Sequence, residues 1–566
     1  MQFVRSARTG SSRARIGGAV LATLVAWLAS PYAALAQTTV DQEALRQRQR
    51  VEDAERQVRE AAPAVHTRAP LEEDSDELPA ETPCFPIREI RLEGAERGFT
   101  WAQRWVRRYE GRCLGEQGVN LVARRLTQRI LARGKVTTRV GVPEQNLKEG
   151  RLRLAVVAGT LARVTFADDR GPRTRWKTAL PLRPGDLIDV RELDQGLEQL
   201  KRIPSQDVEL LLRPGEQAGQ SDLELRLRRT RPWRASLSVD DGGSPSTGKL
   251  QATLTAAIDD PLTLNDLLSV SAQRDADFQP RDHATWGVNG SYSMPWGYWT
   301  FSTSGGTSEY RQNVAMSGQD LRYRGRNTNL DVEVERVIHR GQASKTTASL
   351  SAAKRWGQTW LEDVEIEVQR RDVTSATLGL GHRYTTGKTT VEGQVAVRRG
   401  LPFLAQEDRG SAEAGTTQFT LGTGRVSVTA PFQLGMPLRW RTEVRGQYAD
   451  ERLLVADQFA IGGRYTVRGF DGETTLAAES GACLRNELGM TLPRVRQELY
   501  VALDAGIVDG PSAGKLVGAG LVGAAVGIRG GLWVLSWDAF AGLPVYHPSG
   551  FETARPALGF SATALY

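Results

Sequence analysis

Residues 462–472 read Gly-Gly-Arg-Tyr-Thr-Val-Arg-Gly-Phe-Asp-Gly, and the rest of the chain is best interpreted from this stretch outward. Its four glycines predict a loop built from tight turns, not a helix or a strand. Taken alone, such a loop is most often a solvated surface turn whose arginines face water. A second stretch, further along the chain, favours a different interpretation.

The segment 499–506, Leu-Tyr-Val-Ala-Leu-Asp-Ala-Gly, alternates with a period of two, which is typical of a strand with two unlike faces. The leucines and the valine share one face, and Asp504 lies on the other. In a membrane β-barrel the leucine face meets lipid, so Asp504 points into the lumen. Because an inward carboxylate requires a cation, we expect Arg468, on the glycine-rich loop, to fold inward and pair with Asp504.

The loop tip resembles the VRG(F/Y) tip of the sixth extracellular loop in the outer-membrane insertase and transporter superfamily. Its residues are Val467, Arg468, Gly469 and Phe470. In that superfamily the arginine contacts an inward aspartate of an F-x-D-x-G motif. The matching positions are Ala502, Asp504 and Gly506, so alanine stands where the motif has phenylalanine. The resemblance implies an intact ion pair and leaves the aromatic packing partner in question.

Residues 1–36 have the layout of a secretory signal, with cleavage expected before Gln37. Four arginines precede the short apolar run 16–28, which is why a retained anchor fits less well. Removing this segment takes away four positive charges and no negative one, so the formal net charge of +7 becomes +3. Nucleic-acid binding therefore loses its support. Beyond the signal, no stretch approaches the roughly 18 apolar residues of a spanning helix.

Two polar segments follow the signal. Residues 37–60 are predicted to form a helix that is charged nearly all round, and two interpretations stay open. The helix is either a solvated N-terminal segment or a plug inside a wet, charged lumen. Residues 61–82 are acidic and contain prolines, which predicts an extended linker.

Two successive α/β units of the order β-α-α-β-β are expected next, over 83–159 and 160–230. The first has strands at 85–92, 136–142 and 152–157, with helices at 101–109 and 118–133. The second has strands at 161–166, 208–212 and 223–227, with helices at 173–180 and 190–202. This order resembles POTRA domains, which bind partners by adding a strand to an exposed sheet edge.

The three cysteines divide into a pair and a single residue. Cys84 and Cys113 lie in one compact region of an exported chain, so we expect a disulfide worth roughly 3 kcal/mol. Cys483 is expected to be an unpaired residue of a barrel strand. The five histidines are scattered without ligand spacing, so no metal site and no cofactor are indicated. The surroundings of both paired cysteines, with residues 137–147, resemble the first POTRA domain of the TpsB transporters of two-partner secretion.

From residue 231 to residue 566 the pattern is that of long amphipathic strands. At roughly 20 residues for each strand and turn, this length predicts a membrane barrel of about 16 antiparallel strands. The glycine-rich loop, near 461–475, is expected to fold into its lumen. The final strand alternates with a period of two and carries Phe560 and the terminal Tyr566 on one face, which resembles the signal read by the barrel-assembly machinery.

Two strings resemble nucleotide-binding motifs. Residues 243–250 nearly match a P-loop, but Leu250 replaces the magnesium-binding hydroxyl residue and the segment lies between two strands. Its better match is the D-x-G-x-x-x-T-G hairpin of TpsB proteins. Residues 518–523 match G-x-G-x-x-G without a following helix, which is typical of glycines in a curved barrel strand.

The resemblance to the TpsB family (haemolysin activators and filamentous-haemagglutinin transporters) covers nearly the whole mature chain. It implies a monomer in the outer membrane, with two periplasmic POTRA domains that capture one large exoprotein, TpsA. The exoprotein then crosses the barrel without ATP, and the translocator is not an enzyme. Two alternatives are an assembly insertase, which usually has more POTRA domains, and a diffusion porin, which needs none. The cargo stays open between an adhesin, a cytolysin and a contact-dependent toxin.

Overall fold

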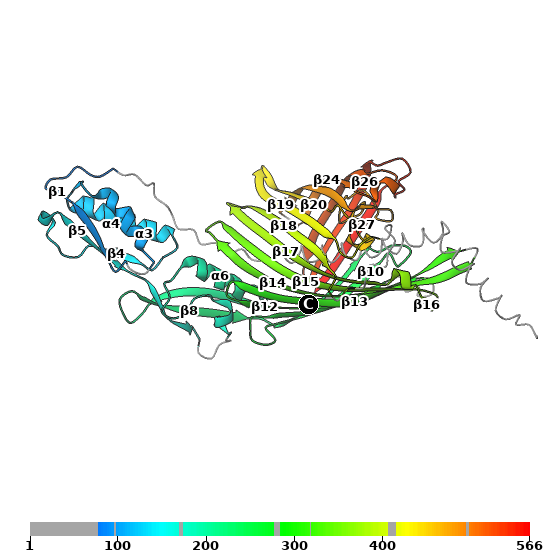
Figure 1. Cartoon of the computed structure of the whole chain (residues 1–566), viewed down its shortest axis with the longest axis horizontal. Helices are drawn as coiled ribbons and strands as arrows, with labels where there is room; N and C mark the ends of the chain where they lie inside the picture. The colour runs from blue at the N-terminus through cyan, green and yellow to red at the C-terminus, as the bar shows by residue number, and fades with distance from the viewer. Residues whose placement is uncertain are drawn as a thin grey trace, which may run out of the picture.

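The computed structural model describes residues 77–95, 98–168, 174–276, 283–316, 319–403, 405, 415–493 and 497–566. The predicted signal segment (1–36), the predicted plug helix (37–60) and the predicted linker up to residue 76 lie outside the described residues. In the described part, two small α/β units precede a large closed β-barrel, and Figure 1 shows the first unit at one end of the molecule.

The first unit contains β1 (Phe85–Pro86), β2 (Glu89–Glu93), α3 (Thr100–Val106), η1 (Arg107–Tyr109), β3 (Cys113–Leu114), α4 (Glu116–Ala132), β4 (Arg139–Gly141), η2 (Leu147–Glu149) and β5 (Arg151–Val157). Its main sheet has the order β2-β5-β4, with β2 parallel and β4 antiparallel to β5. The helix α4 buries Val119, Val122, Leu126 and Ile130, spaced three or four residues apart, in the core under this sheet.

The strand predicted at 85–92 is two strands in the structure. The chain turns between them because Ile87 N donates to Arg112 O at 2.9 Å while Arg88 N donates to Gly150 O at 2.7 Å. As a result β1 pairs with β3, away from the main sheet. This pairing places Cys84 beside Cys113, and the predicted disulfide forms with a Cα–Cα distance of 5.4 Å.

The second unit contains β6 (Thr160–Phe166), α5 (Trp176–Ala179), α6 (Val190–Lys201), β7 (Gln206–Pro214) and β8 (Gln220–Arg229), with the sheet order β6-β8-β7. The helix predicted at 173–180 is a single turn, α5, in the structure. It ends at Ala179 because Pro181 disfavours helical geometry at Leu180. Gly196 on α6 allows close packing, because a Cβ there would lie 2.1 Å from Leu180 Cδ2. The core of this unit therefore joins both helices to the sheet.

The barrel has sixteen long antiparallel strands, as predicted, and a two-residue strand, β16 (Val364–Glu365), extends one hairpin. The long strands are β9 (Trp233–Asp240), β10 (Gln251–Asp259), β11 (Leu267–Asp275), β12 (His283–Trp296), β13 (Trp299–Met316), β14 (Gln319–Arg340), β15 (Ser344–Leu361), β17 (Arg371–Thr386), β18 (Thr389–Leu401), β19 (Thr420–Leu434), β20 (Met436–Tyr448), β23 (Ser480–Leu492), β24 (Gln497–Asp509), β25 (Gly520–Leu532), β26 (Leu535–Tyr546) and β27 (Ala557–Leu565). The wall closes where β27 pairs with β9.

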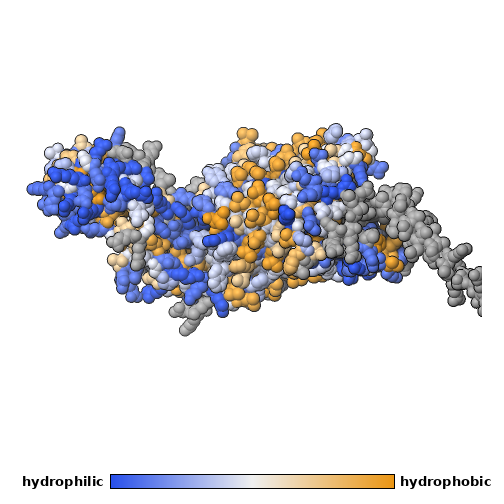
Figure 2. Space-filling model, in the orientation of Figure 1, coloured by the Kyte–Doolittle hydropathy of each residue, from blue (hydrophilic) through white to orange (hydrophobic). Residues whose placement is uncertain are grey.

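Side chains along these strands alternate between the outer surface and the lumen. The outward side chains form an apolar belt, which Figure 2 shows across the barrel. It includes the exposed residues Leu237, Leu254, Val270, Val288, Leu330, Leu350, Leu378, Val397, Val426, Val444, Leu484, Val501, Val526, Leu543 and Leu558. Trp296, Trp299 and Phe301 are exposed around the β12–β13 turn, where an interfacial aromatic girdle is expected.

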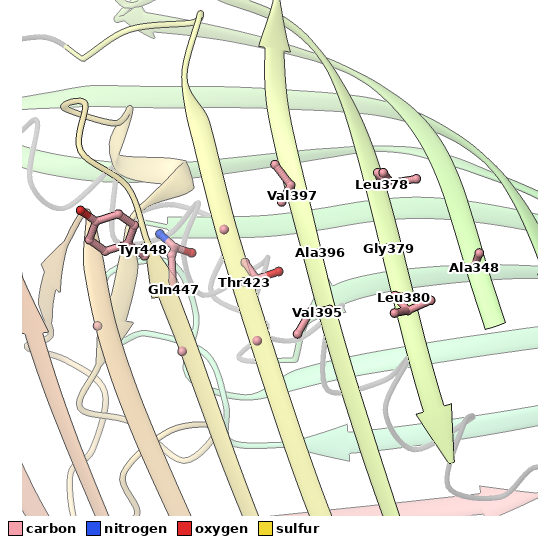
Figure 3. Close-up of a pocket in the computed structure, with 14 residues that line it drawn as sticks. Ala348, Leu378, Gly379, Leu380, Val395, Ala396, Val397, Thr423, Gln447 and Tyr448 are labelled. Carbon is pink, nitrogen blue, oxygen red and sulfur yellow. The ribbon is translucent and has the colours of Figure 1, made fainter. Parts of the chain in front are cut away.

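A hollow of about 830 Å³ lies across β17, β18, β19 and β20 (Figure 3). One side of it is lined by aliphatic side chains that belong to the apolar belt, such as Leu378 and Val395. The hollow forms because Gly422, Gly424 and Gly446 offer no side chain beside them. It therefore belongs to the outer surface of the wall and not to the lumen.

Candidate functional site

Residues 449–479, between β20 and β23, fold into the barrel and are called the inward loop below. The inward loop contains η4 (Val455–Asp457) and a hairpin of β21 (Phe459–Ile461) with β22 (Leu476–Ala478). Five of its apolar side chains are buried in one cluster with residues of the wall and of a neighbouring loop: Ile461, Val467, Phe470, Leu476 and Ala478, with Cys483, Val508, Leu521 and Phe551. A loop that buries this many apolar side chains is part of the interior and not a solvated turn.

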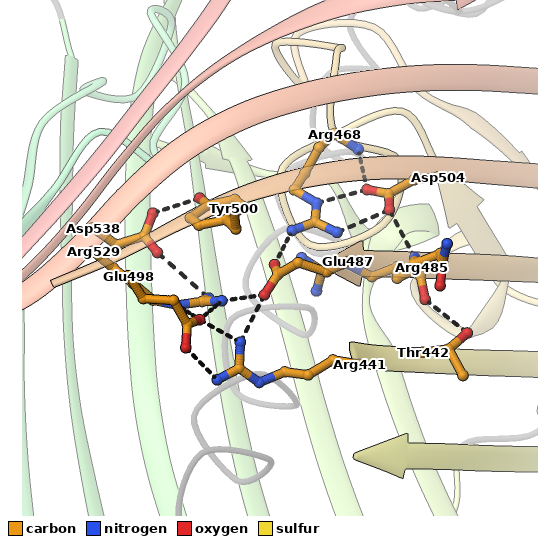
Figure 4. A network of polar contacts seen from close by, with 11 residues as sticks. Arg441, Thr442, Arg468, Arg485, Glu487, Glu498, Tyr500, Asp504, Arg529 and Asp538 are labelled. Carbon is orange, nitrogen blue, oxygen red and sulfur yellow. Dashed lines mark hydrogen bonds and ion pairs between the residues drawn. The ribbon is translucent and has the colours of Figure 1, made fainter. Parts of the chain in front are cut away.

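Arg468 at the tip of the inward loop binds Asp504 on β24 through two parallel hydrogen bonds (Figure 4). Its Nε donates to Asp504 Oδ2 at 2.7 Å, and its Nη2 donates to Asp504 Oδ1 at 2.9 Å. The backbone N of Arg468 donates to the same carboxylate at 3.0 Å, and Nη1 donates to Glu487 Oε2 at 2.6 Å. Arg468 is 5% exposed and Asp504 is 0% exposed. The fork geometry fixes the direction of the tip as well as its position.

Two glycines allow the tip to lie this close to the wall. Gly469 has a φ of +115°, and a Cβ there would lie 2.6 Å from the carbonyl oxygen of Leu543. A Cβ on Gly506 would lie 2.9 Å from Ile461 Cγ2 and 3.1 Å from Val467 Cγ2. Phe470 then packs edge-on against Phe551, with ring centroids 5.6 Å apart. All four residues of the VRGF tip are thus in contact with the barrel interior.

The aromatic partner that is missing at Ala502 is supplied by Tyr500, one inward position earlier on β24. The Cζ of Arg468 lies 5.9 Å from the centroid of the Tyr500 ring, and the Cζ of Arg529 lies 4.5 Å from it. The Tyr500 hydroxyl donates to Asp538 Oδ1 at 2.9 Å. The departure from the family motif therefore moves the ring without removing it.

Glu487 links Arg468 to a wider ionic network on β20, β23, β24 and β25. Arg441 Nη1 lies 2.8 Å from Glu487 Oε1 and 2.7 Å from Glu498 Oε1, and Arg529 contacts both carboxylates (Figure 4). This network was not predicted from the sequence. The sequence pattern that could have indicated it is the alternation of apolar and polar residues along β23 and β25, which places Glu487 and Arg529 on the lumen face.

Two further ion pairs hold the inward loop to other parts of the wall. Asp457, near the base of the inward loop, accepts a hydrogen bond from Arg355 Nη1 on β15 at 3.0 Å and one from Arg398 on β18. Arg464, near the tip, donates to Asp241, just after β9, at 2.6 Å. The inward loop therefore spans the lumen between strands that are far apart in the sequence.

The second POTRA-like unit is joined to the barrel rim by a buried ionic contact. Glu198 on α6 lies 2.7 Å from Arg340 Nη2 and 2.5 Å from Lys345 Nζ, and the Arg340 side chain is 2% exposed. Burial alone would raise the pKa of Glu198, but the two cations lower it below its ordinary value. Nearby, Gln195 Nε2 donates to Gly297 O at 3.1 Å. The unit is therefore fixed at the mouth of the barrel.

The remaining predicted residues lie on the barrel strands. Cys483 is a free, buried cysteine whose sulfur donates to Thr466 O at 3.3 Å, as expected for an unpaired strand residue. Phe560 is exposed on β27, and the Tyr566 ring lies 5.5 Å from that of Trp233. Among the described residues there is no cluster of metal-ligand side chains and no helix long and apolar enough to cross a membrane.

Comparison with known families accounts for both parts of this architecture. The family model described as haemolysin secretion/activation protein ShlB/FhaC/HecB matches residues 219–530, which lie mostly in the barrel. POTRA models match residues 85–159 (the ShlB type) and residues 160–214. The chain belongs to the ShlB/FhaC/HecB family.

Relatives and solved structures agree with this assignment. The chain is 39% identical over 541 residues to the outer membrane transporter CdiB-2 of Burkholderia pseudomallei (strain 1026b), which covers 92% of each chain. It is 26% identical over 415 residues, 73% of each chain, to the hemolysin transporter protein ShlB of Serratia marcescens. The structure of CdiB from Acinetobacter baumannii matches with a TM-score of 0.82 at 28% identity, over 93% of this chain and 99% of that one.

ShlB/FhaC/HecB proteins are outer-membrane translocators of two-partner secretion, and this chain is one of them. The predicted fold class, a barrel of about sixteen strands preceded by two POTRA domains, is confirmed. The barrel therefore lies in the outer membrane, with its apolar belt in lipid and its POTRA domains in the periplasm.

Proposed function

We propose that the exoprotein crosses the lumen unfolded and that the Arg468–Asp504 clamp holds the inward loop in the position that transport requires. The single observation that supports this proposal is the burial of the clamp. Breaking a desolvated pair on one side costs roughly 3–5 kcal/mol, so the inward loop has a strong preference for this site. A polar lumen keeps an extended backbone hydrated as it passes. The proposal assigns no catalytic residue and no cofactor.

We also propose that the POTRA domains capture the secretion domain of the exoprotein at the outer edge of β7. The edge of β2 is blocked, because Leu92 N donates to Gln103 Oε1 at 2.9 Å and Gln103 Nε2 donates to Ile90 O at 2.7 Å. In the described part of the chain β7 pairs only with β8, and it starts next to Ser205, whose N donates to Asp259 Oδ2 of the barrel at 2.9 Å. A strand added to β7 would thus end at the barrel mouth.

The proposed role of the clamp is tested by the variant Arg468→Ala. We expect this barrel to insert into the outer membrane in normal amount and to secrete the exoprotein at least about ten-fold less, as expected for a loss above 1.4 kcal/mol. The matched control is Arg452→Ala, in the same loop, whose Nη2 makes only an exposed hydrogen bond to Pro511 O at 3.2 Å. Normal secretion by Arg468→Ala would contradict the proposal.

The proposed cargo edge is tested by site-specific photocrosslinking. A benzoylphenylalanine at Leu212, an exposed residue of β7, should crosslink the secretion domain of the exoprotein. The same group at Glu89, on the blocked edge of β2, should not. Equal crosslinking at both positions would exclude β7 as the preferred edge. We further propose that the translocator acts as a monomer. We also propose that Phe560 and Tyr566 form the signal for the barrel-assembly machinery.

A further inference from the structure

The joint between the first and last strands, β9 and β27, is the shortest joint between long strands of the described wall. Its register pairs only Ser236–Asp240 with Ser561–Leu565. By comparison, β9 pairs with β10 from Trp233 to Asp240, and β26 pairs with β27 from Leu535 to Gly542. The number of backbone hydrogen bonds between two strands grows with the length over which they pair. The β9–β27 seam is therefore the joint between long strands of the described wall that has the least backbone hydrogen bonding.

The extracellular end of the seam is held by the inward loop. Arg464 Nη1 donates to Asp241 Oδ1 at 2.6 Å and to Phe560 O at 3.2 Å. The same Asp241 oxygen accepts a hydrogen bond from Phe560 N at 2.8 Å. Asp241 directly follows β9, and Phe560 directly precedes the paired part of β27. One guanidinium therefore touches both strands just beyond the point where their ladder ends.

The periplasmic end of the seam is held by aromatic rings. The rings of Trp233 and Tyr566 have centroids 5.5 Å apart. The Cζ of Arg231 lies 5.2 Å from the Trp233 centroid and 5.0 Å from the Tyr566 centroid. In addition, Tyr566 N donates to Ala235 O at 2.8 Å, and Ala235 N donates to Tyr566 O at 3.1 Å. This contact continues the ladder to the last residue of the chain.

We propose that Arg464 and Tyr566 are positioning residues that keep the β9–β27 seam closed at its two ends, and that the inward loop thereby controls the strength of the seam. This role is separate from the clamp at Arg468, because the hydrogen bonds of Arg464 go to Asp241, next to β9, and to Phe560 on β27, whereas those of Arg468 go to β23 and β24. It concerns closure of the wall and not passage of the cargo, so it holds or fails independently of the transport proposal.

The loss of Arg464 and the loss of Tyr566 leave different contacts at the seam. Removing Arg464 leaves Asp241 paired with Phe560 N, so a weakened seam is expected and not an unfolded barrel. Tyr566 contributes a ring and backbone atoms, and no described contact uses its hydroxyl. Tyr566→Phe should therefore keep the seam closed, whereas Tyr566→Ala should open its periplasmic end.

The proposal is tested by hydrogen exchange of the full-length protein in lipid nanodiscs, with peptides resolved by mass spectrometry. In Arg464→Ala, we expect amides in 236–241 and 560–565 to exchange roughly ten-fold faster than in the wild type, because a charge-assisted contact is lost. Amides of the β17–β18 hairpin should not change. Arg452→Ala, which alters an arginine of the same loop away from the seam, should match the wild type.

Two further variants keep the test decisive. The double variant Arg464→Asp with Asp241→Arg reverses the pair and should restore part of the protection at the seam. Tyr566→Phe should match the wild type even if Tyr566→Ala fails to insert. Unchanged exchange at the seam in Arg464→Ala would overturn the proposal. A uniform rise over all strands would overturn it as well, since it would show a general structural role.

Discussion

Arg468 and Asp504 form a two-bond ion pair, at 2.7 Å and 2.9 Å, although 36 residues separate them and both are buried in the lumen. The pair joins the tip of a loop to the wall of the barrel that the loop enters. Because both side chains are buried, the charge of Asp504 is compensated by Arg468, and the charge of Arg468 is compensated by Asp504 and Glu487 together.

Replacing Arg468 with lysine should give an intermediate effect. Lysine keeps the positive charge but cannot form two parallel bonds to one carboxylate. We expect secretion by Arg468→Lys to lie between that of the wild type and that of Arg468→Ala, with barrel content unchanged. The measurement is exoprotein in the medium, normalised to translocator in the outer membrane. A lysine variant with full secretion would show that charge alone holds the inward loop.

Tyr500 should matter through its ring more than through its hydroxyl. Tyr500→Phe keeps the ring over Arg468 and Arg529 and loses one hydrogen bond to Asp538, whereas Tyr500→Leu loses both contacts. We expect Tyr500→Leu to lower the free energy of unfolding of the barrel by roughly 1 kcal/mol more than Tyr500→Phe, and therefore to lower its melting temperature further. Circular dichroism of the purified barrel measures this. Equal losses in the two variants would assign the effect to the hydroxyl.

Glu198 should decide how firmly the second POTRA domain is held to the barrel. Glu198→Gln leaves the buried Arg340 without its carboxylate, at a cost of roughly 3 kcal/mol. We expect α6 to lose protection from hydrogen exchange while the barrel strands keep theirs. The same contact should weaken in acid, since a lowered folded pKa means that stability falls as pH drops below the ordinary glutamate range. Full protection of α6 in Glu198→Gln would contradict this assignment.

Glu192 should give the opposite pH dependence. Burial raises its pKa to about 6, and Lys135 nearby only partly opposes the effect of burial. Because the folded pKa lies above the unfolded one, the stabilising contribution is present in acid and is lost as pH rises through about 6. We expect Glu192→Gln to remove roughly 1 kcal/mol of this pH-dependent change, after allowance for solvent screening.

For Glu192 we would measure the urea concentration at which α6 loses half of its protection from hydrogen exchange. The measurement is compared at pH about 5 and at pH about 7.5. The wild type should be relatively more stable at the lower pH, and Glu192→Gln should show a smaller difference. Identical pH profiles of the two proteins would show that another group is responsible. Asp186 and Asp189, which also act on Glu192, are unchanged in this comparison.

The sequence predicted the strands of the barrel well because lipid on one side and water on the other impose a strict period of two. The same alternation placed Asp504 on the lumen face. It could not show that Arg464 reaches Asp241, because a loop contact across 223 residues leaves no periodic signal. The break at Ile87 was also missed, since it depends on hydrogen bonds to Arg112 and Gly150, which lie just before two different strands, and not on the pattern of apolar residues.

The aromatic partner of the clamp shows a similar limit. The family motif drew attention to Ala502, and the ring lies at Tyr500, on the same face of the same strand. A strand side chain and its neighbour two positions away can reach the same group when the ring is large. Motif spacing alone therefore left this contact in question, and the packing around Arg468 identified it.

The position of the inward loop can be measured most directly by the accessibility of a cysteine placed at its tip. Because glycine at 506 allows the tip to lie against the wall, we propose to test the tip with Gly506 in place: Val467 is 0% exposed, so Val467→Cys, in a Cys483→Ser background, should stay unlabelled by a membrane-impermeant maleimide in intact cells. A freely labelled cysteine at 467 would show that the tip points out to solvent and would contradict the account.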